Sequence, residues 1–429
     1  MITTSIISIC LAAGGSTECV EALLVEATHP GLLSVSAMND SAACTGILDD
    51  SSSHMVIWKD GDVITEVTSF PESFGVLINE AGMAAGLGSY GIFQDDRLVR
   101  ADDDGTFQVL ATISGSEGWS SLTAMNELGS IVGNYSGGSG SSTWQAFAWT
   151  DDAGLMFIEP DATSSYVRDI DENDRVIGYA LYESNYHAFI WEDGVVTDLA
   201  DLLGLGGNSV AWRFDDAGRL LVSEHPAGGA SYYWFDPGDA SLEEIHTFPS
   251  GSYSLRNVVS SNGLVAFSWT NTSNEALAAR WSPANGLEYI EMNEDIVGFT
   301  VTGINGNGRV IGTAFLLPFY EQVAMASGDD LVLEDLEVHT GSNPLTSIAI
   351  DINDNDQVLL RGDYEYWILS ARCEGDADGD GEVNVNDLLL VISSWGGDGG
   401  GDCGPDFDGS GMVDVNDLLN VISAWGSCP

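Results

Sequence analysis

Two short segments near the end of the chain carry mostly acidic residues at alternate positions, a spacing that suits a hard metal ion. The first reads D-A-D-G-D-G-E-V-N-V-N-D from Asp376, and the second reads D-F-D-G-S-G-M-V-D-V-N-D from Asp406. Ca²⁺ binds about six to eight oxygen atoms, and a curled loop supplies them from alternate positions, with a glycine at the sharp turn. The sequence therefore predicts two calcium loops that hold two Ca²⁺ ions.

The candidate ligands occupy equivalent positions in the two loops. They are Asp376, Asp378, Asp380, Glu382, Asn384 and Asp387 in the first loop, and Asp406, Asp408, Ser410, Met412, Asp414 and Asp417 in the second. Glu382 and Met412 would offer a backbone carbonyl, whereas Asn384 and Asp414 would act through a water molecule. Because Ser410 stands where the first loop has Asp380, we expect the second loop to bind calcium more weakly.

The charge of this segment also favours bound cations. Residues 373–429 contain 12 acidic residues and no Lys or Arg. Two acidic loops without metal would leave the mutual repulsion of these carboxylates uncompensated.

Apolar residues at helical spacing follow each loop. They are Leu388, Leu389, Val391, Ile392 and Trp395 after the first loop, and Leu418, Leu419, Val421, Ile422 and Trp425 after the second. This periodicity predicts two helices whose apolar residues form the core of the segment. Val383 and Val413, late in each loop, are expected to pair with each other as two short strands.

Segment 373–429 resembles a type I dockerin. The resemblance rests on Asp387 and Asp417 in place of the Glu of an EF-hand, on the missing entering helix and on the doubled loop-then-helix unit. It implies a small α module with two EF-hand-like calcium loops that docks to a cohesin-like partner. The residues that it places at the partner interface are Val385, Asn386 and Ser393 in one copy and Val415, Asn416 and Ser423 in the other. Because the copies match, we expect the partner to bind in either of two orientations.

The elements that precede this module repeat with a different period. An apolar residue, a polar anchor, a turn and a β-branched run recur between residues 36 and 365, at spacings of 40 to 48 residues. The anchors are Asn39, Asn79, Asn126, Asp171, Asp215, Ser260, Asn305 and Asn353. A second strand with an aromatic residue, a turn and two further strands complete each unit, as in the blade of a β-propeller.

The sequence therefore predicts a mainly β fold, with a propeller over residues 18–371. Eight blades are expected, and the last one takes two strands from residues 357–370 and two from residues 20–38. Seven blades remain the alternative. This holds if the first unit, whose copy of the repeat at Asn39 is weak, is not a blade. Such ring closure would remove exposed sheet edges.

The repeats resemble the HAF repeats of bacterial secreted proteins. The likeness is carried by His187-Ala188-Phe189 and by the run T-D-L-A-D-L-L-G-L-G-G-N-S from Thr197. It implies an extracellular β-propeller and carries no established activity or active site. We therefore expect a non-catalytic binding or scaffolding protein.

The tryptophans divide into two groups by their position in the repeat. Trp58, Trp149, Trp191, Trp234 and Trp281 recur at one position and are interpreted as packing between blades. Trp119, Trp144, Trp212 and Trp269 lie outside that register and are candidate platforms for a polysaccharide.

The alternative function is a propeller enzyme, either a glycoside hydrolase or a polysaccharide lyase. No G-x-S-x-G motif is present, and His54 and His187 occupy equivalent repeat positions, which favours a structural role. Paired carboxylates are the usual route to glycoside hydrolysis. The catalytic residues stay unassigned, because 54 acidic residues precede residue 373.

The net charge limits the partners. The chain has 66 acidic against 12 basic residues, a formal charge of −54. Such a surface repels phosphate backbones and anionic lipids, so we expect no nucleic-acid partner. No apolar run reaches the ~18 residues that a transmembrane helix needs, so we expect no membrane span.

The N-terminus and the cysteines bear on location. Residues 2–13 are apolar and end in small residues, which resembles a signal peptide over residues 1–15, although the basic n-region is missing. A plain N-terminal strand is the alternative. We expect a secreted protein, extracellular or at the cell surface. Cys19 and Cys44 could pair, as could two of Cys373, Cys403 and Cys428.

Overall fold

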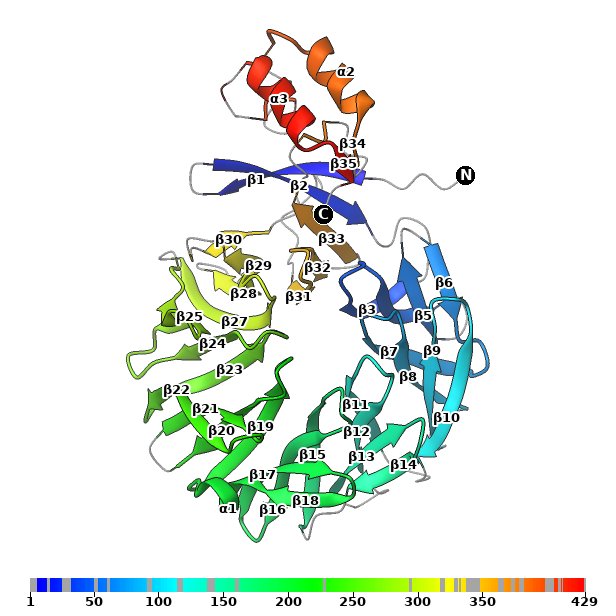
Figure 1. Ribbon diagram of the computed structural model, residues 1–429, viewed down its shortest axis with the longest axis vertical. Helices are drawn as coiled ribbons and strands as arrows, with labels where there is room; N and C mark the ends of the chain where they lie inside the picture. The colour runs from blue at the N-terminus through cyan, green and yellow to red at the C-terminus, as the bar shows by residue number, and fades with distance from the viewer. Residues whose placement is uncertain are drawn as a thin grey trace.

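The computed structural model is mainly β, and its sheets stand side by side around a central axis (Figure 1). It describes residues 6–13, 16–24, 32–49, 53–59, 62–90, 95–113, 119–136, 143–158, 162–226, 229–292, 295–316, 321–327, 331, 333–336, 348–361, 366–371, 375–377, 382–397, 405–407, 410 and 412–427. Sheets made of consecutive antiparallel strands, arranged in this way, form a β-propeller.

The first two four-stranded units share one sheet, through a single parallel bridge between Ser53 and Glu72. Their strands are β3 (Leu32–Met38), β4 (Cys44–Asp49), β5 (Ser53–Lys59) and β6 (Asp62–Glu66), then β7 (Glu72–Ile78), β8 (Ala84–Ser89), β9 (Asp96–Ala101) and β10 (Phe107–Ile113).

Separate four-stranded sheets follow along the chain. They comprise β11 (Trp119–Met125), β12 (Ile131–Ser136), β13 (Trp144–Thr150) and β14 (Gly154–Ile158); β15 (Ser164–Ile170), β16 (Val176–Tyr182), β17 (Asn185–Glu192) and β18 (Val195–Asp198); β19 (Asn208–Phe214), β20 (Leu220–His225), β21 (Gly229–Asp236) and β22 (Ser241–Pro249); β23 (Tyr253–Val259), β24 (Val265–Thr270), β25 (Ala276–Ser282) and β26 (Gly286–Tyr289); and β27 (Ile296–Ile304), β28 (Val310–Leu316), β29 (Glu321–Ser327) and β30 (Leu333–Asp335). A short helix, α1 (Leu199–Leu203), joins β18 to β19.

The last sheet is built from both ends of the propeller. Its order is β1-β2-β33-β32-β31, with β1 (Ile6–Ala13), β2 (Ser16–Leu24), β31 (Ile348–Ile352), β32 (Val358–Arg361) and β33 (Tyr366–Ala371). The expected assignment of residues 20–38 was half wrong. β2 pairs with β33, but β3 belongs to the first unit, because the turn at Asn39 pairs β3 with β4.

The described part of the expected signal peptide, residues 6–13, forms strand β1, as the alternative proposed. It pairs with β2 in an antiparallel hairpin and lies at the outer edge of the last sheet. Removal of residues 1–15 would therefore leave the pairing of β2 with β33 in place, and the signal peptide stays a prediction.

The polar anchors lie at equivalent turns and are all buried. The backbone N–H of each anchor donates to the carbonyl four residues later, so each turn is closed in the same way. Each asparagine anchor also donates from Nδ2 to the backbone oxygen of the next anchor. These bonds join Asn39 to Asn79 (2.9 Å), Asn79 to Asn126 (3.0 Å), Asn126 to Asp171 (2.9 Å), Asn305 to Asn353 (3.0 Å) and Asn353 to Asn39 (3.1 Å).

We call this series of hydrogen bonds from one anchor to the next the amide ladder. It is interrupted where the anchor has no side-chain amide. Asp171 instead accepts from Nε of Arg175 at 2.7 Å, and Arg175 reaches the backbone oxygen of Gly218 in the next unit. Asn353 donates to Asn39 across 314 residues of sequence, so one side-chain bond helps to close the ring.

The tryptophans of the repeat register are buried, as predicted, with 8% or less of each exposed. They pack in the clusters between neighbouring sheets. Of the tryptophans outside the register, Trp119 is 76% exposed, whereas Trp269 is 5% exposed and contacts Phe248. The interpretation of Trp269 as a carbohydrate platform was therefore wrong, because its side chain points from β24 into the core.

Cys44 is a buried free thiol, so the suggested Cys19–Cys44 disulfide does not form. Burial raises the pKa of this thiol, with a smaller contribution from the charge of Asp351. Cys373, Cys403 and Cys428 lie outside the described residues.

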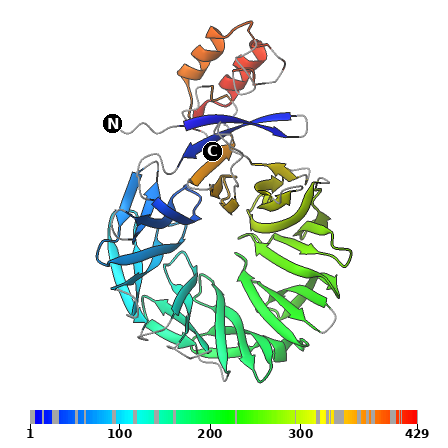
Figure 2. The ribbon, with the colours of Figure 1, turned by 180° about the vertical axis from the view of Figure 1, so that it is seen from behind.

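The C-terminal module, residues 373–429, lies outside the ring beside β1 and β2 (Figures 1 and 2). It contains β34 (Glu382–Val383), α2 (Val385–Ser393), α3 (Val415–Ser423) and β35 (Gly426–Ser427). Among the described residues no helix is both long and apolar enough to cross a bilayer.

Candidate functional site

The two loops of the C-terminal module close in the same way. One carboxylate oxygen of Asp387 accepts the backbone N–H of Ala377 at 2.8 Å and the other accepts that of Asn384 at 2.6 Å. In the second loop Asp417 accepts from Phe407 at 2.7 Å and from Asp414 at 2.8 Å. The last residue of each loop therefore ties the loop's start to the first turn of its helix.

Three carboxylates of these loops are completely buried. Asp376, Asp387 and Asp417 are each 0% exposed. A buried carboxylate is costly unless a cation or several hydrogen bonds offset its charge. Since residues 373–429 contain no Lys or Arg, no basic side chain of the module can supply that charge. The buried carboxylates thus fit a hard divalent cation such as Ca²⁺.

The residues at the ninth loop position act as helix caps. The side chain of Asn384 accepts the N–H of Asn386 at 2.8 Å, and Asp414 accepts that of Asn416 at 2.8 Å. The side-chain oxygen of Asn384 thus serves the start of α2, and its role as a ligand through water stays a prediction. Capping of this kind stabilises a helix start by about 1 kcal/mol.

Ser410 is exposed in the second loop and bonds to the loop backbone. Its hydroxyl donates to the backbone oxygen of Met412 at 3.1 Å, and that oxygen is itself a predicted ligand. Asp378, Asp380 and Asp408 lie outside the described residues, as does the side chain of Glu382.

The expected pairing of Val383 with Val413 was wrong. Val383 pairs with Gly426, while Val413 exchanges backbone hydrogen bonds with Gly396 and Gly397. The first loop is thus joined to the residues that follow α3, and the second loop to the residues that follow α2. This exchange arises because the two copies run antiparallel, so that the loop of each lies beside the helix end of the other. Both valines are buried.

The predicted core of the module was also largely wrong. Val391 and Val421 are buried with Val383 and Val413, and Leu388 and Leu418 are half-buried. The remaining apolar residues are more than half exposed, namely Leu389, Ile392, Trp395, Leu419, Ile422 and Trp425. Two nine-residue helices are too short to cover more than one row of side chains each.

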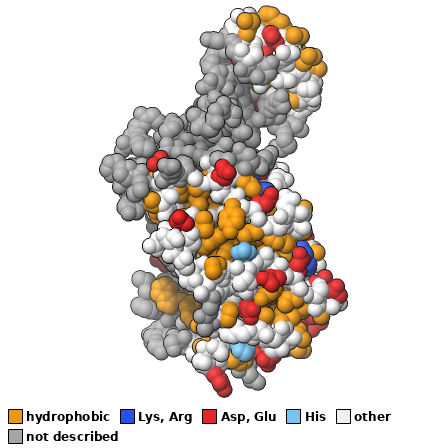
Figure 3. All heavy atoms as spheres, turned by 90° about the vertical axis from the view of Figure 1, so that its left-hand side faces the viewer, with side chains coloured by type: hydrophobic (Ala, Val, Ile, Leu, Met, Phe, Trp, Pro, Cys, Tyr) orange, Lys and Arg blue, Asp and Glu red, His pale blue; other side chains and the backbone are white. Residues whose placement is uncertain are grey.

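The predicted partner-binding residues are all exposed. Val385, Asn386 and Ser393 lie on or beside the uncovered face of α2, and Val415, Asn416 and Ser423 occupy the same places on α3. Together with the exposed apolar residues they form two matching surfaces. Contiguous apolar surface of this kind marks interaction sites. Figure 3 shows hydrophobic side chains at the surface of this module, which stands at the top of the view.

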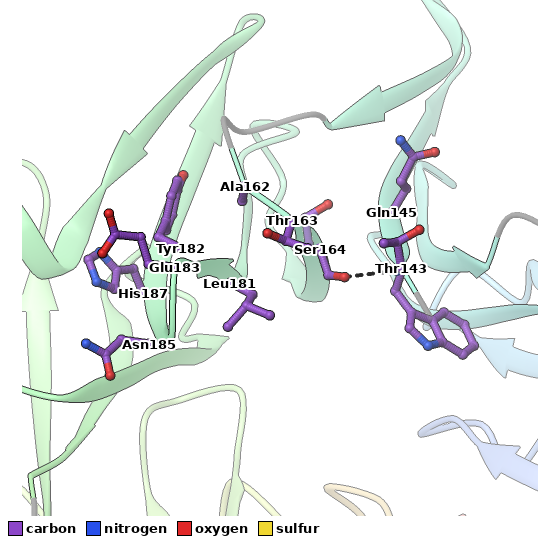
Figure 4. A pocket seen from close by; sticks show the side chains of 12 residues that line it. Thr143, Gln145, Ala162, Thr163, Ser164, Leu181, Tyr182, Glu183, Asn185 and His187 are labelled. Atoms are coloured by element: carbon purple, nitrogen blue, oxygen red, sulfur yellow. Dashed lines mark hydrogen bonds between the residues drawn. The ribbon is translucent and has the colours of Figure 1, made fainter. Parts of the chain in front are cut away.

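A second site lies in the propeller, between the sheets of β13 and β15–β17. It is a pocket of about 880 Å³ that is widely open to solvent. Figure 4 shows Thr143 and Gln145 on one side of it, Glu183 and His187 on the other, and Ser164 between them. Trp144 and Tyr182 add aromatic surface to the lining.

Local contacts hold the walls of this pocket in place. The hydroxyl of Ser164 accepts the backbone N–H of Trp144 at 3.2 Å, which links the two sheets. The rings of Tyr182 and His187 lie 5.2 Å apart. Nδ1 of His187 is 2.7 Å from Asp198. Polar groups beside aromatic faces suit a polar, uncharged ligand such as a sugar.

The pair of His187 and Asp198 is a feature of the repeat. In the first unit Nδ1 of His54 lies 2.8 Å from Glu66, at the equivalent position. The His–carboxylate pair therefore belongs to the repeat, and in the first unit it joins β5 to β6.

Two buried aspartates that the sequence analysis missed lie beside the anchors. Asp169 accepts the backbone N–H of Phe214 at 2.8 Å, and Asp351 accepts that of Met38 at 3.1 Å. Burial raises the pKa of both carboxyls, that of Asp351 to about 6, although the charge of Arg213 opposes the shift. The sequence could have identified them. In the motifs D-I-D and D-I-N an aspartate stands two residues before the anchor, whereas the other repeats have no acidic residue at that position.

Carboxylates next to the anchors also link neighbouring units. Glu80 accepts the N–H of Asp40 at 2.8 Å, and Glu127 accepts that of Glu80 at 3.1 Å. Burial raises the pKa of Glu80 from 4.5 to about 7, and the nearby charges of Asp40, Glu127 and Asp354 add to the shift. Acidic side chains likewise outnumber basic ones on the face in Figure 3.

This shift predicts a pH dependence of stability. Because Glu80 ionises near pH 4.5 in the unfolded chain and near pH 7 in the folded chain, rising pH through that window favours unfolding. We expect Glu80→Gln, which keeps the acceptor oxygen, to reduce the loss of stability between these pH values. Denaturant midpoints measured across the window test this, and an unchanged pH profile in the variant would contradict it.

Comparisons with known proteins add little to this description. No family model and no curated protein match the sequence. A streptogramin B lyase structure matches at 10% identity and a TM-score of 0.43, over 82% of this chain and 97% of that one. Oligogalacturonate lyase from Vibrio parahaemolyticus matches at 11% identity and a TM-score of 0.49, over 86% and 98%. The propeller fold rests on the sheet topology, and no activity follows from these likenesses.

Proposed function

We propose that this protein is a secreted, non-catalytic binding or scaffolding propeller that carries a calcium-binding dockerin. The observation that carries the proposal is the burial of Asp376, Asp387 and Asp417 in a module without basic residues. Two Ca²⁺ ions would neutralise these groups and hold the loops closed. The duplicated helices would then present their uncovered faces to a cohesin-like partner.

Eight blades are part of the proposal. Seven units have four consecutive strands each, from β3 to β30, and the last sheet takes β31, β32 and β33 from one end and β2 from the other. Eight anchor turns agree with this number. A mixed blade of this kind would keep both ends of the propeller paired.

For the propeller we propose polysaccharide binding in the pocket around Trp144. Aromatic side chains and uncharged polar groups make up part of its lining, together with Glu183 and His187, and such a mixture suits a sugar. The enzyme remains the alternative. Hydrolysis of a glycosidic bond uses two facing carboxylates, and Glu183 is the one carboxylate among the described residues that line the pocket. This favours binding over hydrolysis.

A glycan array followed by titration tests the pocket. We expect Trp144→Ala to weaken binding of the best glycan about tenfold, a loss of about 1.4 kcal/mol. The control is Trp119→Ala, because Trp119 is exposed and does not line the pocket. Equal losses in the two variants, or reducing sugar released by the unmodified protein, would contradict non-catalytic binding at this pocket.

A pull-down against a panel of cohesins tests docking. We expect binding in calcium and none in chelator. A charge at one copy, as in Asn386→Arg, should leave one orientation and nearly full binding, whereas Asn386→Arg with Asn416→Arg should abolish it. Full binding by the double variant would exclude these faces as the interface.

A further inference from the structure

A cluster of possible metal ligands lies at the end of the β15–β18 sheet. His187 comes from β17, Asp198 ends β18 and Asp201 lies in the first turn of α1. One ligand atom from each of the three lies within 4.8 Å of the others. Side chains from three elements thus lie close enough together for one ion to reach all three.

The local structure holds this cluster in place. Asp198 caps α1 by accepting the N–H of Asp201 at 3.1 Å through Oδ1, while Oδ2 lies 2.7 Å from Nδ1 of His187. Leu199 and Ala200 are buried, so α1 is anchored on the sheet. The fold therefore holds His187 and Asp198 side by side, and an ion bound between them would replace the hydrogen bond that joins them.

The first unit offers a natural comparison. His54 and Glu66 form the same pair at 2.8 Å. Among the residues that the structure describes, no third ligand completes that pair, whereas Asp201 completes the pair of His187. In the described part of the propeller α1 is the only helix. Asp201, the third ligand, lies in this helix, so it is specific to this unit.

The donor set selects the type of ion. An imidazole nitrogen with two carboxylate oxygens suits borderline cations such as Zn²⁺, whereas Ca²⁺ and Mg²⁺ prefer oxygen donors alone. Two carboxylates match the double positive charge. His187 and Asp198 are both 24% exposed at the side chain, so an ion can enter from solvent.

We propose that His187, Asp198 and Asp201 bind a divalent transition metal ion, with Zn²⁺ as the probe. Three protein ligands leave a fourth position of a tetrahedral ion for water or another ligand. Because His187 also lines the pocket around Trp144, the ion would lie next to a molecule bound there. The site is separate from the calcium loops and does not depend on them.

Titration of the full chain with Zn²⁺ tests the proposal, with excess Ca²⁺ present to occupy the C-terminal loops. We expect one strong Zn²⁺ site, weakened more than about tenfold in His187→Gln and in Asp201→Asn. Asp201→Asn keeps a polar side chain in α1, so loss of binding cannot be assigned to loss of the helix. The matched control is His54→Gln, which should bind Zn²⁺ like the unmodified protein.

Substitution with Co²⁺ gives a second readout, because its visible absorption reports nitrogen and oxygen ligation directly. Thermal unfolding of each variant checks that the fold is intact. No strong Zn²⁺ site in the unmodified protein would overturn the proposal, as would unchanged affinity in His187→Gln and Asp201→Asn, or an equal loss in His54→Gln.

Discussion

Removal of calcium is expected to unfold the C-terminal module and to leave the propeller folded. Without the ions, the burial of Asp376, Asp387 and Asp417 would no longer be offset by divalent charge, and the 12 acidic residues of segment 373–429 would repel one another. Unfolding exposes these groups to water and removes both costs. At a free calcium concentration a thousand times the Kd, each ion contributes about 4 kcal/mol to the folded module.

Hydrogen exchange with and without chelator measures this effect residue by residue. The amides of α2 and α3 should lose protection, while those of β12, β16 and β24 keep it. Asp387→Asn should reproduce most of the effect in calcium, because the second loop has Ser410 in place of a carboxylate. Loss of protection in the propeller strands as well would show that the two parts fold as one unit.

The second large effect is expected at the closing anchor of the ring. Asn353→Ala should lower the free energy of unfolding of the propeller by about 2–4 kcal/mol, since it leaves the buried backbone oxygen of Asn39 without this donor and removes the acceptor of two part-buried N–H groups. The Asn353 amide donates to the backbone oxygen of Asn39, and its own oxygen accepts the N–H groups of Asn355 and Gln357. The side chain is 5% exposed, so water cannot replace these bonds.

Ser260→Ala is the matched control for this prediction. Ser260 is an equally buried anchor, but its hydroxyl bonds only within its own turn, to Asn262 and Leu264. We expect a loss of about 1 kcal/mol there. Denaturant unfolding in excess calcium, followed by the fluorescence of the buried tryptophans, compares the two variants. Similar losses would mean that the amide ladder between units adds nothing to ring stability.

The repeat made most of the propeller predictable. Each anchor, turn and strand is specified within about ten consecutive residues, and all eight predicted anchors are buried at equivalent turns. The exception was the last sheet, where β2 and β33 pair across more than 300 residues. Local patterns carry no information on which distant strands meet, so β3 was misassigned.

The loops of the C-terminal module were predictable for a related reason. The spacing from Asp376 to Asp387 is a short-range pattern that the second loop repeats. The last residue of each loop, Asp387 or Asp417, is buried. Periodicity also located α2 and α3, but it could not separate Val391, which is buried, from Leu389, which is 57% exposed. Both residues fit a helical period, and only the size of the module decides which of them another element covers.

By itself, therefore, the sequence determined the repeats, the anchors and the acidic loops, because each depends on neighbours in the chain. Only the tertiary structure decided the closure of the ring, the exposed faces of α2 and α3, and the pocket. Trp144 and His187 are 43 residues apart, yet line one cavity because neighbouring sheets pack together. Asp201 meets His187 because a short helix folds back onto its own sheet, and no spacing rule along the chain predicts that contact.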